Sequence, residues 1–276
     1  MFSEGSMSSA VLPSTAPVAV GGKDMLRQFA VIFVTILTIT VNALANILPI
    51  NGMQTGDISD SYPVLFTPAG YVFSIWGVIY LGLIAYTVFQ ALPAQRGNPQ
   101  MRAIGWIYVV SGLANSLWIF LWHYLAFGWS VLVILVLLVS LALIYARLWP
   151  VRSQVSRGER WTTHVPFSIY LGWASVATVA NVSVWLYDLG WNGGFLAPEW
   201  WTVIMLAVAS VLGLLFGLRL HDAAYVLVLV WAFTGIWVKQ SATPVVAWTA
   251  AGLAVVMAVV AIIAIVQNRR VPRVPA

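Results

Sequence analysis

Two hydrophobic stretches of the chain each carry tryptophan and asparagine at steps of three or four residues. The residues concerned are Asn115, Trp118 and Trp122 in the first stretch, and Trp173, Ala177 and Asn181 in the second. Residues at such steps share one face of an α-helix. A flat indole ring can stack on a planar guest, and an amide can hydrogen-bond a polar group of that guest. The spacing therefore favours a pocket for a large, flat, apolar ligand.

The same stripes also allow a simpler interpretation. Asparagine side chains hydrogen-bond between membrane helices, and tryptophan rings fill the space between them. Of the 15 tryptophans, eight near the ends of hydrophobic stretches suit an aromatic belt at the membrane surface: Trp106, Trp129, Trp149, Trp161, Trp191, Trp200, Trp201 and Trp248. Trp76, Trp118, Trp173 and Trp231 lie well inside such stretches and need another explanation.

Other familiar chemistry has little support in the sequence. The chain has no cysteine, which excludes thiolate ligands and thiol nucleophiles. Its three histidines, His123, His164 and His221, belong to different spans or turns and cannot all meet at one metal ion. We therefore expect structural roles for them, with haem ligation by one of them as the alternative. No nucleophile elbow or phosphate loop occurs. These absences favour a binding protein over an enzyme.

The elements that position these residues must be membrane helices. The chain has 276 residues, of which 61% are hydrophobic and 8% are charged; soluble domains have about 25% charged residues. Its mean hydropathy is +0.92. These values exclude a water-soluble fold and indicate an all-α, polytopic transmembrane bundle. The net charge is +5. The basic residues fall in short loops between the apolar stretches, where they set the orientation of the protein in the membrane, so we expect no nucleic-acid partner.

Eight stretches are long and apolar enough to span a bilayer. They cover about residues 27–48, 70–92, 103–125, 129–149, 164–187, 200–219, 222–239 and 244–267. All lysines and arginines but Lys239 fall on one side of this arrangement. The positive-inside rule then places both termini in the cytoplasm of a multi-pass protein, which we expect in a bacterial plasma membrane.

The ends of the chain differ from these stretches. Residues 1–25 are rich in serine, alanine, glycine and proline and predict a disordered cytoplasmic tail, and residues 269–276 predict a basic cytoplasmic tail. An alternative for the first stretch is a signal peptide cleaved near Ala43-Leu44-Ala45. After this stretch, residues 49–68 form the longest loop, and their aromatic and proline residues favour a lid over a cavity.

Three motifs in this order resemble the TspO/MBR family, the translocator proteins also called tryptophan-rich sensory proteins. The matching residues are Pro68, Phe73, Trp76 and Tyr80 in the second helix, Asn115, Trp118 and Trp122 in the third, and Pro166, Trp173, Ala177 and Asn181 in the fifth. The chain departs from the family at Tyr71, where tryptophan is usual, and in the distances from Phe73 to Trp76 and from Pro166 to Trp173. The resemblance covers about residues 27–190.

This resemblance implies a five-helix domain over residues 26–190, whose outer half encloses a cavity capped by the first loop. It implies binding of porphyrin, haem, sterols or other flat apolar ligands, for sensing, transport or turnover, with no cofactor required. The ligand-binding residues carried over are Trp76, Tyr80, Asn115, Trp118, Trp122, Trp173, Ala177 and Asn181. Alternatives are a membrane-embedded porphyrin-modifying enzyme and a structural subunit of a larger membrane complex.

Residues 191–268 predict three additional transmembrane helices outside this resemblance. The sixth span carries small residues at four-residue steps, including Gly213 and Gly217. Such a stripe lets helices approach closely in lipid. It either packs these helices within the chain or forms a contact with a second copy or another membrane protein.

Overall fold

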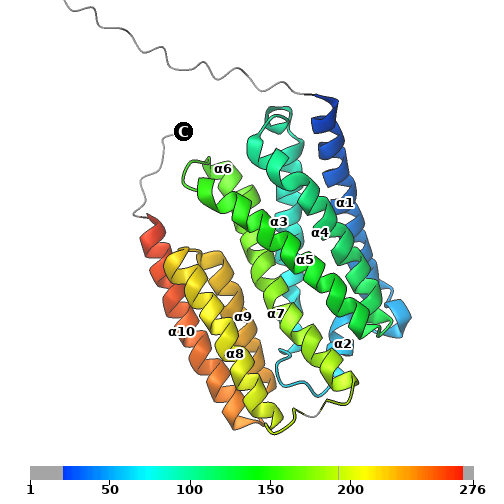
Figure 1. Cartoon of the computed structure of the whole chain (residues 1–276), viewed down its shortest axis with the longest axis vertical. Coiled ribbons are helices and arrows are strands. Elements are labelled where there is room, and N and C mark those ends of the chain that lie inside the picture. The colour runs from blue at the N-terminus through cyan, green and yellow to red at the C-terminus, as the bar shows by residue number, and fades with distance from the viewer. Residues whose placement is uncertain (1–20, 192, 270–276) are drawn as a thin grey trace, which may run out of the picture.

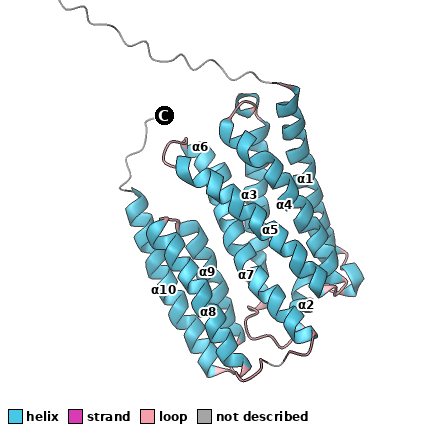
Figure 2. Cartoon of the chain, in the orientation of Figure 1, coloured by secondary structure: helices cyan, strands magenta, loops and turns pink. Residues whose placement is uncertain are grey.

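The computed structural model describes residues 21–269 except residue 192. The described residues fold entirely into helices and connecting turns (Figure 2). The helices are α1 (Gly22–Ile47), α2 (Thr55–Asp60), α3 (Ile75–Ala91), α4 (Pro99–His123), α5 (Phe127–Leu148), α6 (Arg157–Glu159), α7 (Val165–Asp188), α8 (Pro198–Leu214), α9 (Ala223–Lys239) and α10 (Pro244–Arg269). Shorter turns precede or extend some of them, among them η2 (Gly70–Ser74) before α3.

The predicted polytopic bundle is confirmed. Seven of the described helical segments are long and apolar enough to cross a membrane. The seventh predicted span forms α9, which has 17 residues and a length of about 25 Å, a little short of a bilayer core of about 30 Å. Asp222 fixes the start of α9, because its carboxylate accepts hydrogen bonds from two backbone N–H groups of the first turn.

The helices form two groups that lie side by side (Figure 1). In the N-terminal group, α1 packs on α3 and α4, and α7 packs on α3 and α5. In the C-terminal group, α8, α9 and α10 pack on one another. The two groups meet mainly where α7 contacts α9. At Gly172 the approach is close, since a Cβ atom there would lie 3.1 Å from the Cβ of Val228.

The small residues of α8 serve packing within the chain. A Cβ at Gly213 would collide with Met257 of α10 and with Leu229 of α9, and one at Gly217 would collide with Val260 of α10. Both glycines are buried. The stripe therefore joins α8 to its neighbours, as in the first of the two alternatives, and association with a second copy stays a prediction.

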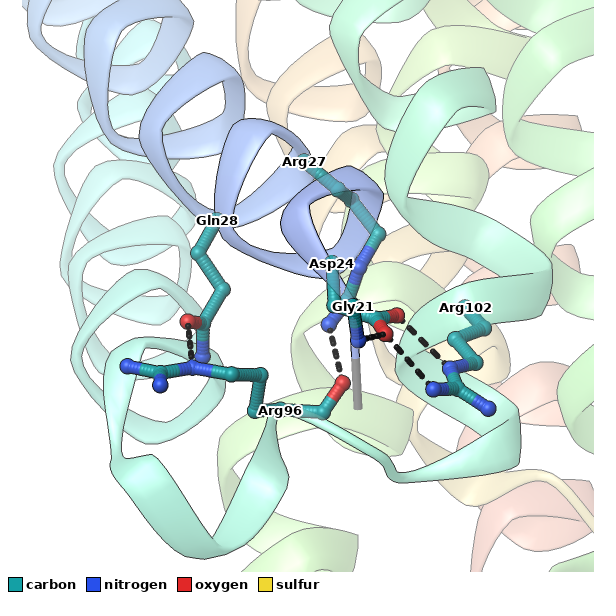
Figure 3. A network of polar contacts seen from close by, with 6 residues as sticks. All are labelled: Gly21, Asp24, Arg27, Gln28, Arg96 and Arg102. Atoms are coloured by element: carbon teal, nitrogen blue, oxygen red, sulfur yellow. Dashed lines mark hydrogen bonds and ion pairs between the residues drawn. The ribbon is translucent and has the colours of Figure 1, made fainter. Parts of the chain in front are cut away.

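Polar contacts hold the start of α1 at one end of the bundle (Figure 3). The Asp24 carboxylate pairs with the Arg102 guanidinium of α4 through two contacts of 2.6 and 2.7 Å. Arg27 donates to the carbonyl of Arg96 at 3.0 Å, and the Arg96 Nε donates to the Gln28 side chain at 3.1 Å. Charged residues expected just before the first span thus lie within the first turns of α1.

The end of the bundle where α1 begins, α6 lies and α10 ends is called the basic end below (Figure 1). Residues 1–20 of the predicted N-terminal tail and residues 270–276 of the basic tail lie outside the described residues. The first helix is an integral part of the bundle, because Val31, Val34 and Ala45 of α1 are at most 1% exposed. This packing favours its retention over cleavage near Ala45.

Candidate functional site

Five aromatic side chains from three helices converge opposite the basic end, and we call them the aromatic cluster. They are Trp76 and Tyr80 of α3, Trp118 and Trp122 of α4, and Trp173 of α7. The Trp76 ring lies 5.7 Å from Tyr80 and 6.2 Å from both Trp118 and Trp173, measured between ring centroids. Trp118 stacks on Trp122 at 6.0 Å. Residues from the second, third and fifth spans are therefore brought together.

One predicted asparagine belongs to this cluster. The Trp118 indole N–H donates to the Asn181 Oδ1 at 2.8 Å, and the Asn181 Nδ2 donates to the Ser130 Oγ at 2.9 Å. These bonds join α4, α7 and α5, and both Trp118 and Asn181 are buried. Asn181 thus fixes the orientation of the Trp118 ring by a hydrogen bond across helices.

The other predicted asparagine is engaged elsewhere. Asn115 is fully buried, and its Oδ1 accepts a hydrogen bond of 2.7 Å from the Asn42 Nδ2 of α1. This contact ties α1 to α4. Ala177 is half-buried and packs beside the hydrophobic core. The role of Asn115 and Ala177 in ligand binding stays a prediction.

The indole N–H of Trp173 is a buried polar group of the cluster. Its ring is 2% exposed and lies edge-on to Trp76 and to Phe73, the latter at 5.8 Å. Within the described part of the chain, its buried N–H has no hydrogen-bond partner. An unpaired buried donor costs about 1–3 kcal/mol. A ligand that offered an acceptor at this point would remove that cost.

The loop predicted as a lid packs over one end of the cluster, and we call residues 48–69, which contain this loop, the covering segment. It folds into η1 (Ile50–Gly52) and α2, and the Trp122 indole N–H donates to the Thr55 carbonyl at 3.2 Å. The Thr55 hydroxyl lies 3.1 Å from the His123 Nε2. Farther along, Phe66 is fully buried. The segment thus covers the cluster, as a lid would.

A second set of contacts ties this covering segment to the C-terminal group. Lys239 at the end of α9 forms an ion pair with Asp60 of α2, and its ammonium lies 3.0 Å from the Thr67 hydroxyl. The backbone N–H of Ala69 donates to the carbonyl of Gly235 at 3.1 Å. The covering segment is therefore held by α9, a helix of the C-terminal group.

Tyr62 of the covering segment packs edge-on against Phe127 at 5.1 Å. Burial raises the pKa of the Tyr62 phenol, and the nearby Asp188 carboxylate raises it further. The side chain therefore stays neutral at physiological pH and keeps a hydroxyl that can donate a hydrogen bond.

The cluster is filled by its own side chains. Trp118, Trp122 and Trp173 are between 2% and 5% exposed, so a planar guest would have to displace rings or the covering segment. Displacement of packed groups is a normal route to pockets that a ligand makes dominant. The arrangement supplies stacking surfaces and few polar groups, which suits binding better than acid–base chemistry.

Two contributors to the cluster were not expected from the sequence. Tyr170 lies 6.0 Å from Trp76 by ring centroids, and Ser130 bonds Asn181. Tyr170 stands three residues before Trp173, so helical spacing alone places it on the same face. Ser130 is one of the few polar residues of α5 and stands in its first turn, so it could have been suspected for that reason.

A family model described as TSPO-like protein matches residues 28–263. The chain belongs to this TSPO-like family. The match extends past the motif-bearing region and takes in α8, α9 and most of α10. The three C-terminal helices are thus part of what the family model describes, and the protein is a TSPO-like, multi-pass membrane protein. Comparison with curated proteins and with solved structures found no match.

Proposed function

We propose that this TSPO-like protein binds a flat, largely apolar ligand at the aromatic cluster, with porphyrin, haem and sterols as the candidate classes. The observation that carries the proposal is the unpaired N–H of Trp173 among four tryptophan rings. Each stacked ring contributes about 0.5–1.5 kcal/mol beyond area burial. An acceptor on the ligand would pair with the Trp173 N–H, and the rings would supply most of the affinity.

The covering segment gives this site a route of entry. Its contacts with α9 include the half-exposed Lys239–Asp60 ion pair, and exposed pairs of this kind are weak. Opening of residues 48–69 would bare the Trp122 end of the cluster, where the Thr55 carbonyl now accepts the indole N–H. Binding would serve sensing, transport or turnover of the ligand.

The test is a titration of the detergent-purified protein with protoporphyrin, followed by tryptophan fluorescence and by the porphyrin absorbance band. We expect saturable binding in the wild type and binding at least about tenfold weaker in the double variant Trp118→Phe/Trp173→Phe. Phenylalanine keeps an aromatic ring and removes both indole N–H groups. Linear, non-saturating changes that are equal in both proteins would mean that the cluster only packs the bundle.

We also propose that the basic end faces the cytoplasm of a bacterial-type plasma membrane, as the positive-inside rule requires. The absence of cysteine makes this testable with single-cysteine variants. Ser156 lies in the exposed segment before α6, and Ser241 is exposed at the opposite end, between α9 and α10. In intact cells, a membrane-impermeant maleimide should label Ser241→Cys, and should label Ser156→Cys only after permeabilisation. The reverse pattern would invert the topology.

A further inference from the structure

A large cavity lies at the basic end, between the N-terminal and C-terminal helix groups, and we call it the arginine cavity. Its volume is about 1470 Å³, whereas pockets for drug-sized molecules measure about 300–1,000 Å³. Residues of α3, α7, α9, α10 and the segment 149–161 line it. None of the five residues of the aromatic cluster lines it, and it has room for a ligand larger than a typical small molecule.

The end of the cavity nearest the membrane surface is positively charged. Three of its lining residues are arginines, Arg152, Arg157 and Arg160, and one is acidic, Asp222. The Asp222 carboxylate accepts hydrogen bonds from the Ser168 hydroxyl at 2.6 Å and from two backbone N–H groups of α9, and its single negative charge offsets only one of the three arginines. In the described part of the chain, neither Arg152 nor Arg157 forms an ion pair. The cavity thus carries unbalanced positive charge.

Arg152 is held in place rather than left in solvent. Its guanidinium lies over the Trp149 ring, 3.3 Å from the centroid, and donates to the backbone carbonyl of Leu220 between α8 and α9. Burial lowers the pKa of Arg152, although nearby Tyr145 and Asp222 oppose that effect. A guanidinium fixed in this way presents its remaining N–H donors at a defined place, which suits recognition of phosphate. Arginines that merely set topology need no such support.

Farther from the arginines the cavity is largely apolar. There it is lined by Ile75 and Val78 of α3, Ile169 of α7, and Leu227, Val228 and Trp231 of α9, with Ser74 as a polar neighbour. From Ala223 to Trp231 the lining follows α9 over nine residues, or about 12 Å. Polarity therefore falls from the basic end toward the middle of the bundle, as it does along a lipid molecule.

We propose that the arginine cavity binds an anionic phospholipid, with the phosphate beside Arg152 and Arg157 and acyl chain between α3, α9 and α10. Hydroxyl groups of Ser153 and Ser156, which also line the cavity, can donate to phosphate oxygens. Basic pockets between membrane helices are attractive to anionic headgroups. The site needs the C-terminal group, since α9 and α10 form one of its walls. It does not depend on the function proposed for the aromatic cluster.

The experiment titrates the delipidated full-length protein in detergent with dioleoyl phosphatidylglycerol and, separately, with dioleoyl phosphatidylcholine. Native mass spectrometry counts the bound lipid. We expect saturable binding of phosphatidylglycerol that is at least about tenfold tighter than binding of phosphatidylcholine. The double variant Arg152→Gln/Arg157→Gln should lose about tenfold in phosphatidylglycerol affinity. Equal affinity for the two lipids in the wild type would overturn the proposal.

Two matched variants separate the cavity from general surface charge. Arg219→Gln removes one positive charge from an exposed site at the basic end that does not line the cavity, and its affinity should stay within about twofold of wild type. Leu227→Trp fills the apolar part without changing charge and should weaken binding. A loss in Arg219→Gln as large as in the double variant would show nonspecific attraction and overturn the proposal.

Two further measurements keep the test decisive. If the double variant does not fold, Arg157→Gln alone replaces it, because Arg157 is exposed and makes no ion pair among the described residues; about threefold weaker binding is expected. Inorganic phosphate at millimolar concentration is added as a competitor. Retention of the bound lipid supports a lipid site, and displacement at that concentration would show a site for free phosphate instead.

Discussion

The aromatic cluster and the arginine cavity lie in one bundle, but the first is filled and the second is open. The cluster forms where α3, α4 and α7 turn large rings toward one another, so that Trp118 and Trp173 are at most 5% exposed. The cavity forms where two helix groups meet and leave about 1470 Å³ between them. Substitutions in the cluster should therefore change stability together with binding, whereas substitutions of exposed residues that line the cavity should change binding with little effect on stability.

The largest expected effect comes from truncating a ring of the cluster. Trp173→Ala should lower the free energy of unfolding by about 3–5 kcal/mol, because it removes a buried indole from a packed site. The matched variant is Trp161→Ala, since Trp161 lines the cavity and is 61% exposed. It should cost less than about 0.5 kcal/mol. Equal losses of stability in reversible detergent-based unfolding would remove the distinction between the two regions.

The next effect concerns the packing of the C-terminal group, whose helices α9 and α10 contribute to the lining of the cavity. Gly217→Leu should cost about 1–3 kcal/mol, because any side chain there collides with Val260 of α10. Gly252→Leu is the control, since no atom lies within 4 Å of a Cβ at that position. We also expect Gly217→Leu to weaken phosphatidylglycerol binding and to leave protoporphyrin binding unchanged. Loss of porphyrin binding instead would show that the two regions are coupled.

An effect of similar size isolates one hydrogen bond of the cluster. Asn181→Leu leaves the buried Trp118 N–H without its partner, which should cost about 1–3 kcal/mol. Adding Trp118→Phe removes that donor and should restore part of the stability. A strictly additive double variant, measured by the same unfolding assay, would mean that this bond contributes nothing to the packing of the cluster.

The smallest expected effect lies on the link between the regions. Lys239→Ala breaks the half-exposed ion pair with Asp60 and should cost no more than about 1 kcal/mol. The difference from wild type should shrink further in about 1 M salt, where surface charges are screened. A large, salt-independent loss would show that α9 holds the covering segment mainly through this contact.

The sequence predicted the helices well, because span length and hydrophobicity are local properties. All eight hydrophobic stretches form helices, and α9 is shorter than a typical span since Asp222 caps it. The family resemblance grouped Trp76, Trp118 and Trp173 in one site, and the Trp76 ring lies 6.2 Å from each of the other two. Spacing alone could not predict that Asn115 bonds Asn42 of α1, because it shows which residues share a helical face and not which helix packs against that face.

The arginine cavity shows what the sequence could not predict. Arg152, Arg157 and Arg160 were explained by topology alone, since they lie between two spans. Their significance depends on α9 and α10, which lie more than sixty residues later and pack beside them only in the folded chain. A cavity between helix groups has no sequence pattern of its own, because its position depends on how the helices pack in the folded chain.

The most direct test of the account compares both regions in one assay. Protoporphyrin carries carboxylates as well as a flat ring, so it could choose either region. We titrate the wild type, Trp118→Phe/Trp173→Phe and Arg152→Gln/Arg157→Gln with it and follow its absorbance. The account predicts weaker binding in the tryptophan variant and unchanged binding in the arginine variant. Weaker binding in the arginine variant alone would place the porphyrin in the cavity and contradict the role assigned to the aromatic cluster.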